Sequence, residues 1–222
     1  MECERDFFEQ RLYPFQDRAL RAFAGVDTGF YLTGGTAASR GYLHHRFSDD
    51  LDLFVNDDAR FTLWSERLIA VAAGAFRRTE VLLREQRFVR FEIAEGDLTL
   101  KVELVDDVPA HVGEIRTDPV LGRLDAPENI LANKLTALVD RREPKDLADV
   151  WGFCCKQGLS LQAALEGAQG KAVGLFPPDV ARALLEAERT DWELVRWVSP
   201  PDAGEYLAAI RKLGEGLIVL GR

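Results

Sequence analysis

Asp50 and Asp52 are the two residues whose type and spacing most clearly predict chemistry in this sequence. They lie in the segment 50–55, DLDLFV, whose alternation of polar and apolar residues predicts a β-strand. Side chains two positions apart on a strand point to the same face, so the two carboxylates would lie side by side and repel each other. A magnesium ion relieves such repulsion, because it prefers oxygen ligands and typically binds one or two carboxylates together with substrate phosphates. The pair therefore predicts a magnesium site; the alternative is an acidic turn that simply precedes the strand.

A glycine-rich turn, Gly34-Gly35-Thr36, lies upstream of the two aspartates. It follows the apolar residues 30–32 and precedes a predicted helix, so its main-chain N–H groups and the helix N-terminus could bind phosphate. Glycine permits a close approach, the Thr36 hydroxyl could add a donor, and Ser39 on the helix could also face the phosphates. The alternative is an ordinary tight turn. The segment is not a P-loop, because the lysine and Ser/Thr that should follow a longer glycine loop are missing.

Glu103 is a third acidic candidate, on the predicted strand 98–106. Apolar residues alternate with Lys101 and Glu103 there, so these two share the face away from the core. Glu103 could join the aspartates as a metal ligand or act as general base on an incoming hydroxyl. Alternatively it pairs with Lys101 or a neighbouring arginine, and Asp106 at the strand end is a competing candidate.

The order of these features is more informative than any one of them. A strand, a Gly-Gly turn, a helix, an Asp-x-Asp strand and a third acidic strand follow one another. Phosphoryl and nucleotidyl transfer need metal ions, two of them during turnover in our expectation, to neutralise a triphosphate and align the nucleophile. The arrangement thus predicts a metal-dependent transfer of a phosphate-containing group.

A second cluster of charged residues lies in the later part of the chain. Lys134 and Arg141 are spaced to share one helical face, and a lysine and an arginine aimed at one cleft can hold a triphosphate. Asp146 and Asp149 also share a helical face. They could orient Lys134 and Arg141, form buried ion pairs with them, or take part only in surface salt bridges.

The elements that must position these residues form a mixed α/β front half and a helical back half. We expect strands at 30–32, 50–55, 79–84, 87–94 and 98–106, and helices at 4–24 (broken at Pro14), 36–43 and 60–75. After a linker with glycine and proline, we expect helices at 126–140, 145–156, 160–169, 177–189, 191–197 and 203–213. The predicted fold is α/β (α+β), with a catalytic domain over residues 1–118 and a helical domain over 119–222 that completes the nucleotide cleft.

Composition limits the remaining classes. The formal charge of −9 argues against a protein that coats nucleic acid non-specifically, although local clusters of arginine remain. No apolar run approaches the roughly 20 residues needed to span a bilayer. The charged N-terminus lacks the apolar segment of a secretory signal, and the odd count of three cysteines does not suggest a disulfide framework. We therefore expect a cytoplasmic protein without a membrane partner.

Two segments resemble a known family. Residues 34–54, GGTAASRGYLHHRFSDDLDLF, are similar to the signature of the AbiEii/AbiGii-type nucleotidyltransferases, a branch of the DNA-polymerase-β-like superfamily. In that signature a His-Arg-x-Ser step, here beginning at His45 and Arg46, leads into Asp-x-Asp. Residues 133–153, NKLTALVDRREPKDLADVWGF, are similar to the family's helical motif. Its characteristic positions are filled by Lys134, Arg141, Lys145, Asp146 and Asp149. The resemblance covers about residues 30–155.

The resemblance implies a nucleotidyltransferase-type mixed sheet with flanking helices, followed by a helical domain. It implies magnesium-dependent transfer of NMP from an NTP to an acceptor hydroxyl, with His45 and Arg46 supporting the site. Because the family includes bacterial toxins, it also implies an RNA acceptor such as tRNA and a protein antitoxin. The alternatives are transfer to a small molecule, as in antibiotic nucleotidyltransferases, and NTP binding without turnover.

Overall fold

The computed structural model describes residues 2–171 and 175–220 of the chain, which form two compact units. Unit 1 comprises Met1–Ala37, Ser48–Pro109 and Ile115–Asp125, and unit 2 comprises Ala38–Phe47, Ala110–Glu114 and Ala126–Arg222. Each unit is assembled from separate stretches of sequence. The short segment 38–47 therefore belongs with the helical unit, although the residues on both sides of it belong to unit 1.

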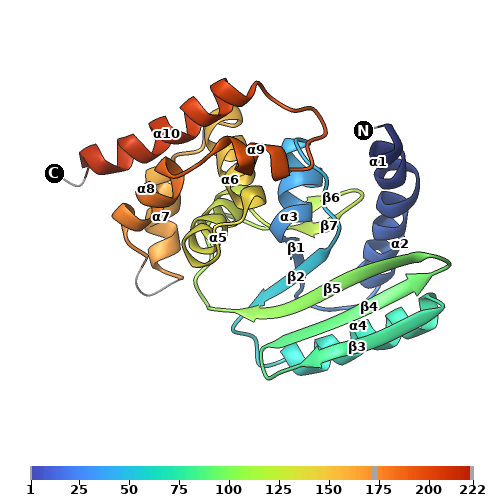
Figure 1. Ribbon diagram of the computed structural model, residues 1–222. Helices are drawn as coiled ribbons and strands as arrows, with labels where there is room; N and C mark the ends of the chain where they lie inside the picture. The colour runs from blue at the N-terminus through green and yellow to red at the C-terminus, as the bar shows by residue number, and fades with distance from the viewer. Residues whose placement is uncertain (1, 172–174, 221–222) are drawn as a thin grey trace. The chain divides into compact units, whose positions relative to one another are not determined.

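Unit 1 is built on a seven-stranded mixed sheet with the strand order β3-β4-β5-β2-β1-β7-β6 (Figure 1). The strands are β1 Tyr31–Thr33, β2 Leu51–Asn56, β3 Arg78–Arg84, β4 Phe88–Glu95, β5 Leu98–Asp107, β6 Arg116–Asp118 and β7 Gly122–Leu124. The strands β3, β4 and β5 form an antiparallel meander, while β2 pairs in parallel with β5 and antiparallel with β1.

Alternating side chains give this sheet one apolar and one polar face. Leu51, Leu53 and Val55 of β2 are buried, and the residues between them are only partly buried. Strands β4 and β5 show the same alternation. The apolar face is covered by helices, as the ring contact of Phe23 with Phe91 of β4 illustrates. Because successive side chains alternate, Asp52 must point to the opposite, polar face.

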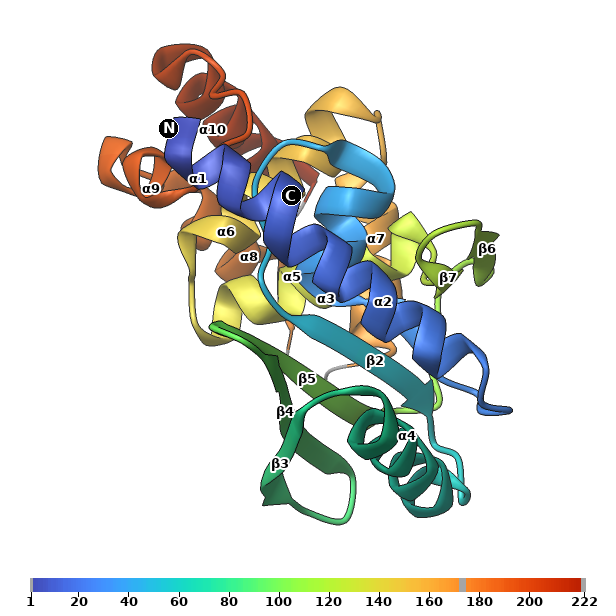
Figure 2. The same ribbon diagram turned by 90° about the vertical axis from the view of Figure 1, so that its right-hand side faces the viewer.

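Helices α1 Glu2–Phe7, η1 Phe8–Leu12, α2 Tyr13–Ala24 and α4 Phe61–Ala75 belong to unit 1. Helix α2 packs against α4 and β7, and α4 packs against β3 and β4 (Figure 2). The helix expected to be kinked or split near Pro14 is divided into α1, the π-helical segment η1 and α2, which begins one residue before the proline. Pro14 lies in the first turn of α2, where its missing N–H group is least costly.

Unit 2 is mainly helical. Its helices are α5 Pro127–Asp140, α6 Pro144–Trp151, η3 Gly152–Lys156, α7 Leu161–Gln169, α8 Pro177–Leu185, α9 Arg189–Leu194 and α10 Ala203–Leu220. The segment α3 Gly34–Thr36 continues directly into η2 Ala37–Leu43, most of which belongs to unit 2. Helix α5 packs against α6, α7 and α8, and α10 packs against α8 and α9. None of the helices in the described part of the chain has the length and apolar character required to cross a bilayer.

The stretch expected to be a linker, 110–125, contains two short strands instead. Strand β7 pairs in parallel with β1, β6 pairs with β7, and the main-chain N–H of Asp125 donates to the carbonyl of Leu32. Each strand has only three residues, which is too short for a periodic pattern to be visible in the sequence. The pairing with β1 is a long-range contact, so local sequence signals do not predict it.

Candidate active site

Gly34 begins the turn after β1 and lies directly against the carboxylate of Asp52. Antiparallel pairing places Thr33 opposite Asp52, which brings the turn and the carboxylate together. Gly34 has a φ of +65°, and a Cβ atom at this position would lie 2.0 Å from Asp52 Oδ2. Only glycine fits both the backbone conformation and the space. The turn therefore holds Asp52 by close packing.

Thr36 holds the segment that leads into the first aspartate. Its buried hydroxyl donates to the carbonyl of Asp50 and bonds Ser48 Oγ at 3.0 Å. From the other side, Gln16 Nε2 donates to the carbonyls of Ser48 and Asp49 at 3.1 and 2.8 Å. The segment 48–50 is thus fixed at both sides. The Thr36 hydroxyl that the sequence assigns to phosphate is used inside unit 1.

The three acids gather on the polar face of the sheet. Asp52 and Glu103 are directly opposed partners on the parallel strands β2 and β5, so they share a face. Lys101, two residues before Glu103 on the same face, places its Nζ 2.8 Å from Asp50 Oδ2 and 3.3 Å from Glu103 Oε1. One ammonium group therefore joins the first and the third acid.

Arg90 provides a second positive charge on this face. It is the cross-strand partner of Glu103, and its Nε and Nη2 both lie 2.8 Å from Glu103 Oε1. Partial burial lowers the pKa of Lys101, but its contacts with Asp50 and Glu103 outweigh that effect, so the pKa is raised from its ordinary value. The competing candidate Asp106 is used elsewhere: it accepts from the Asp58 main-chain N–H at 3.0 Å. Of the two strand-β5 candidates, Glu103 alone contacts the cation that also holds Asp50.

The fit of these residues to a divalent cation can be judged from the donor set. Within the described residues, no group of three or more His, Cys, Asp or Glu side chains is arranged to hold a metal ion. The ammonium of Lys101 instead takes the position between Asp50 and Glu103 where a cation would be held. Carboxylate oxygens are the ligands magnesium prefers, and two of these carboxylates already share one cation. The oxygen donors are of the type that magnesium prefers, but in this structure Asp50 and Glu103 are held by Lys101.

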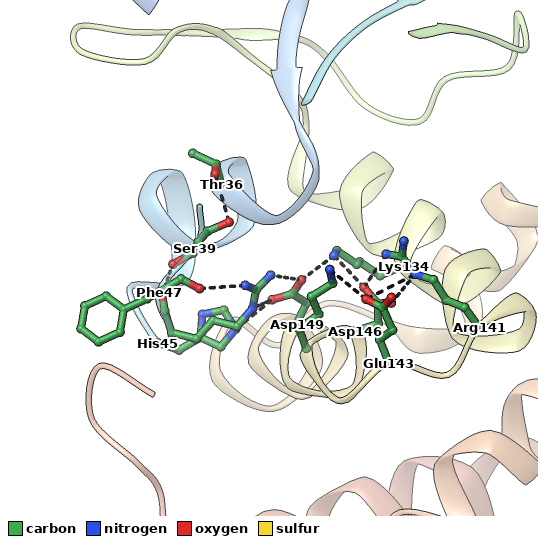
Figure 3. Close-up of polar contacts among 12 residues, drawn as sticks. Thr36, Ser39, His45, Phe47, Lys134, Arg141, Glu143, Asp146 and Asp149 are labelled. Atoms are coloured by element: carbon green, nitrogen blue, oxygen red, sulfur yellow. Dashed lines mark hydrogen bonds and ion pairs between the residues drawn. The ribbon is translucent and has the colours of Figure 1, made fainter. Parts of the chain in front are cut away.

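Unit 2 contains a buried ionic cluster centred on Asp149 of α6 (Figure 3). The Arg46 guanidinium binds the Asp149 carboxylate in a bidentate way, with Nε to Oδ1 at 2.7 Å and Nη2 to Oδ2 at 2.8 Å. His45 Nε2 lies 3.0 Å from Asp149 Oδ1. Lys134 Nζ lies between the two helix-α6 acids, 2.7 Å from Asp149 Oδ2 and 2.8 Å from Asp146 Oδ1. Of the alternatives that the sequence left open for Asp146 and Asp149, the structure shows buried ion pairs.

Burial and charge together determine the protonation states in this cluster. Burial alone would raise the pKa of Asp149, but Arg46 and Lys134 outweigh it and the pKa lies well below its usual value. Burial lowers the pKa of Lys134, yet Asp149 and Asp146 outweigh it and the pKa is raised. For His45, burial dominates and lowers the pKa. Asp149 thus faces two cations, Arg46 and Lys134, and the imidazole of His45 beside it is neutral.

The remaining predicted residues of unit 2 lie around this cluster. Arg141 follows the last residue of α5 and is half exposed, with Nε 3.0 Å from Asp146 Oδ2. Ser39 donates its hydroxyl to the carbonyl of Arg46, which fixes the chain next to the cluster. Lys145 lies outside the cluster and pairs with Glu143 at 2.8 Å. Within the described residues, Lys145 therefore reaches the cluster only through Glu143, whose carbonyl accepts from the Asp146 main-chain N–H at 2.9 Å.

The structure thus groups the predicted residues by unit. Unit 1 brings together Gly34, Asp50, Asp52 and Glu103, with Gly35 and Thr36 in the adjoining turn. Unit 2 brings together Ser39, His45, Arg46, Lys134, Arg141, Asp146 and Asp149. Glu103 pairs with Lys101 and Arg90, which is the alternative that the sequence left open for it, although neither cation was among the predicted site residues. The signal for Lys101 was its position two residues before Glu103, whereas Arg90 reaches the site only through the β4–β5 pairing.

Comparison with known proteins gives one family and a shared fold. The family model described as nucleotidyl transferase AbiEii toxin, type IV TA system, matches residues 18–194. A candidate nucleotidyltransferase from H. pylori superposes with a TM-score of 0.64 at 20% identity, over 94% of this chain and 95% of that one. JHP933 from Helicobacter pylori gives a TM-score of 0.64 at 19% identity, over 93% of this chain and 92% of that one. No curated protein sequence matches the chain. The predicted mixed α/β fold is confirmed.

Proposed function

The chain belongs to the AbiEii family of nucleotidyltransferase toxins of type IV toxin–antitoxin systems, and we propose that it transfers NMP from an NTP to an acceptor hydroxyl in a magnesium-dependent reaction. The observation that carries this proposal is the grouping of three carboxylates on one sheet face. Asp52 and Glu103 are in register on neighbouring strands, and Asp50 shares a cation with Glu103. Family membership gives the class of enzyme, and this grouping supports the choice of Asp50, Asp52 and Glu103 as the proposed catalytic residues.

Each residue of unit 1 has a proposed role that follows from its position. Asp50 and Asp52 would hold magnesium, which when bound neutralises the triphosphate and polarises its α-phosphate. Gly34 lies against the Asp52 carboxylate and Gly35 follows it in the same turn, so their main-chain N–H groups are the proposed contacts for the triphosphate. Thr36 would serve by fixing the main chain at Asp50.

Glu103 is proposed to complete the metal site or to take the proton of the acceptor hydroxyl. Arg90 and Lys101 both contact its Oε1. In the transfer, the acceptor oxygen forms a bond to the α-phosphorus, the bond to the β-phosphate oxygen breaks, and pyrophosphate leaves with its electron pair.

In unit 2, Lys134 and Arg141 are the residues proposed to bind the triphosphate, on the ground of their spacing and their positive charge. Lys134 is buried and bonded to Asp146 and Asp149, so in this conformation it acts as their counter-ion. Arg141 has the half-exposed guanidinium, positioned by Asp146, and is the better placed of the two to bind phosphate. We propose that His45, Arg46, Asp146 and Asp149 support this arrangement, with Ser39 and Lys145 as further candidates for nucleotide contact and support.

The proposed acceptor is an RNA hydroxyl, such as that of tRNA, and the proposed protein partner is an antitoxin. The support for the antitoxin is the description of the family as the toxin of a type IV toxin–antitoxin system, and the support for the RNA acceptor is the sequence resemblance alone. A small-molecule acceptor and NTP binding without turnover are the outcomes that compete with this proposal.

The test is incubation of the protein with each α-³²P-labelled NTP and magnesium, against total tRNA, other RNA and an aminoglycoside. We expect label on RNA with the wild type and none with Asp52→Asn. Label on the aminoglycoside alone would replace the RNA acceptor by a small molecule. NTP binding by the wild type with no label on any acceptor would contradict turnover.

A further inference from the structure

The salt bridges of Lys101 raise a question that the proposed reaction leaves open: how a metal ion enters a site that already holds a cation. Lys101 Nζ lies 2.8 Å from Asp50 Oδ2 and 3.3 Å from Glu103 Oε1. These are ordinary ion-pair distances, so the ammonium occupies the space between the two carboxylates. A metal ion that bound both acids would have to displace it.

The charges around Lys101 indicate what it does before any ligand arrives. Three carboxylates, those of Asp50, Asp52 and Glu103, share the polar face with two cationic side chains, Lys101 and Arg90. Without Lys101, Asp50 would lack its ion-pair partner in the described structure and the carboxylates would repel one another more strongly. Lys101 therefore keeps the acids together in the absence of metal, and by the same contacts it competes with metal.

The position of Lys101 also suits an exchange of partners. The residue lies in strand β5 opposite Glu92 of β4, so its main chain is fixed by strand pairing, while its long side chain is one-third exposed. A lysine side chain has a flexible four-carbon stem and a strongly hydrated charge, so it can leave one anion for another nearby. A triphosphate bound to a divalent cation supplies what this exchange needs. The metal is a new cation for Asp50 and Glu103, and the phosphate oxygens are new anionic partners for the Lys101 ammonium.

We propose that Lys101 is a resident cation of the carboxylate site, which opposes metal binding to the nucleotide-free protein and moves to the nucleotide's phosphates when the metal–nucleotide complex binds. This inference rests on the proposed function for the identity of the anionic ligand. It makes metal and nucleotide binding cooperative. The nucleotide's phosphates accept the displaced ammonium, which favours metal binding, and the metal neutralises the carboxylates, which favours binding of the anionic nucleotide. Lys101 is a positioning residue for the carboxylates and becomes a binding residue for the phosphates.

The test measures Mn²⁺ binding directly, by loss of the free-ion EPR signal, with and without a non-hydrolysable NTP analogue. The variants are Lys101→Gln, Lys101→Arg and Arg84→Gln. Arg84→Gln removes one positive charge from the same unit. Within the described residues Arg84 pairs with the exposed Glu66, so this variant controls for net charge. Circular dichroism and thermal unfolding check that each variant is folded.

For the nucleotide-free protein, we expect Lys101→Gln to bind Mn²⁺ about tenfold or more tightly than the wild type, because a charge at contact distance is removed. Lys101→Arg and Arg84→Gln should stay near the wild type. The nucleotide analogue should increase the Mn²⁺ affinity of the wild type strongly. The factor of increase should be at least about tenfold smaller for Lys101→Gln.

The proposal is overturned if Lys101→Gln binds Mn²⁺ no more tightly than the wild type, if Arg84→Gln gives the same gain, or if neither protein binds Mn²⁺. Its failure is separate from failure of the proposed function. If Lys101→Gln gains Mn²⁺ affinity while no NTP gives label transfer to any acceptor, the role of Lys101 stands and the proposed reaction does not.

Discussion

Replacing Gly34 by alanine is the most informative single perturbation of the candidate site. The new Cβ would lie 2.0 Å from Asp52 Oδ2, whereas ordinary contacts begin at 3.4 Å, so the carboxylate oxygen must retreat by about 1.4 Å. The residue would also be held at a φ of +65°, which costs a non-glycine residue about 1–2 kcal/mol. Gly34→Ala therefore combines backbone strain with displacement of one carboxylate.

Gly96→Ala is the matched control for the backbone strain. Gly96, in the turn between β4 and β5, has a φ of +61°, and nothing lies within 4 Å of a Cβ placed there. It should lose about 1–2 kcal/mol of unfolding free energy and keep its activity. The difference between the two variants isolates the displacement of Asp52.

The assay combines urea unfolding with the rate of label transfer from an α-³²P-labelled NTP. Both variants should lose a similar free energy of unfolding from strain, with about 1–3 kcal/mol more for Gly34→Ala from overpacking. Transfer by Gly34→Ala should fall about 100-fold, because a misplacement of about 1 Å in a catalytic group has that order of effect. Wild-type transfer by Gly34→Ala, or an equal loss of activity in Gly96→Ala, would refute the reasoning.

Two further predictions concern the buried cluster of unit 2. Lys134→Met should lower the free energy of unfolding by about 3–5 kcal/mol, because it removes a cation from two buried carboxylates. The control Lys145→Met, at an exposed ion pair, should change the free energy of unfolding by less than about 1 kcal/mol. Urea denaturation measures both variants, and equal effects would contradict the burial of Lys134. His45 has a lowered pKa in the folded protein, so the unfolded chain takes up a proton first as pH falls. The stabilising contribution of the neutral ring is present above about pH 6.5 and is lost as pH falls below it. Urea unfolding between pH 7.5 and 5 should show a shallower pH dependence for His45→Gln than for the wild type, and superimposable profiles would be evidence against a neutral buried imidazole.

Local sequence signals were sufficient for the elements with a clear period. Strand β2 alternates polar and apolar residues, and β4 and β5 flank a Glu95-Gly96-Asp97 turn, so all three were predicted within one or two residues. Helices α4 and α5 likewise follow from their apolar spacing. Strands β6 and β7 could not be predicted, because a three-residue strand has no readable period and exists only through pairing with β1 or with its neighbour.

The site was predictable in its residues and less so in its contacts. The spacing of Asp50 and Asp52 and the position of Glu103 on a strand indicate a shared face, and the register of β2 with β5 places Asp52 beside Glu103. The partners of these acids depend on tertiary structure. No sequence period relates Arg46 to Asp149, which are 103 residues apart, whereas Arg90 lies opposite Glu103 through the register of the β4–β5 hairpin.

The same limit explains why Lys134 was expected to face a triphosphate. Its spacing to Arg141 suggested one helical face, but α5 ends at Asp140 and α6 begins at Pro144, so Arg141 lies in the connection between the helices. Lys134 is buried against both aspartates of α6, and only tertiary packing determines this. The pattern of charges along a chain can indicate which residues form ion pairs. It does not indicate whether those pairs are buried or exposed.

The central claim is that the carboxylates of unit 1 catalyse transfer of a nucleotide. The most direct measurement compares α-³²P-labelled with γ-³²P-labelled NTP in the presence of magnesium and total RNA, using the wild type and Asp52→Asn. We predict label on the acceptor from the α-labelled NTP only, release of the γ-label as pyrophosphate, and loss of both signals in Asp52→Asn. Transfer of the γ-label, or undiminished transfer by Asp52→Asn, would contradict the claim.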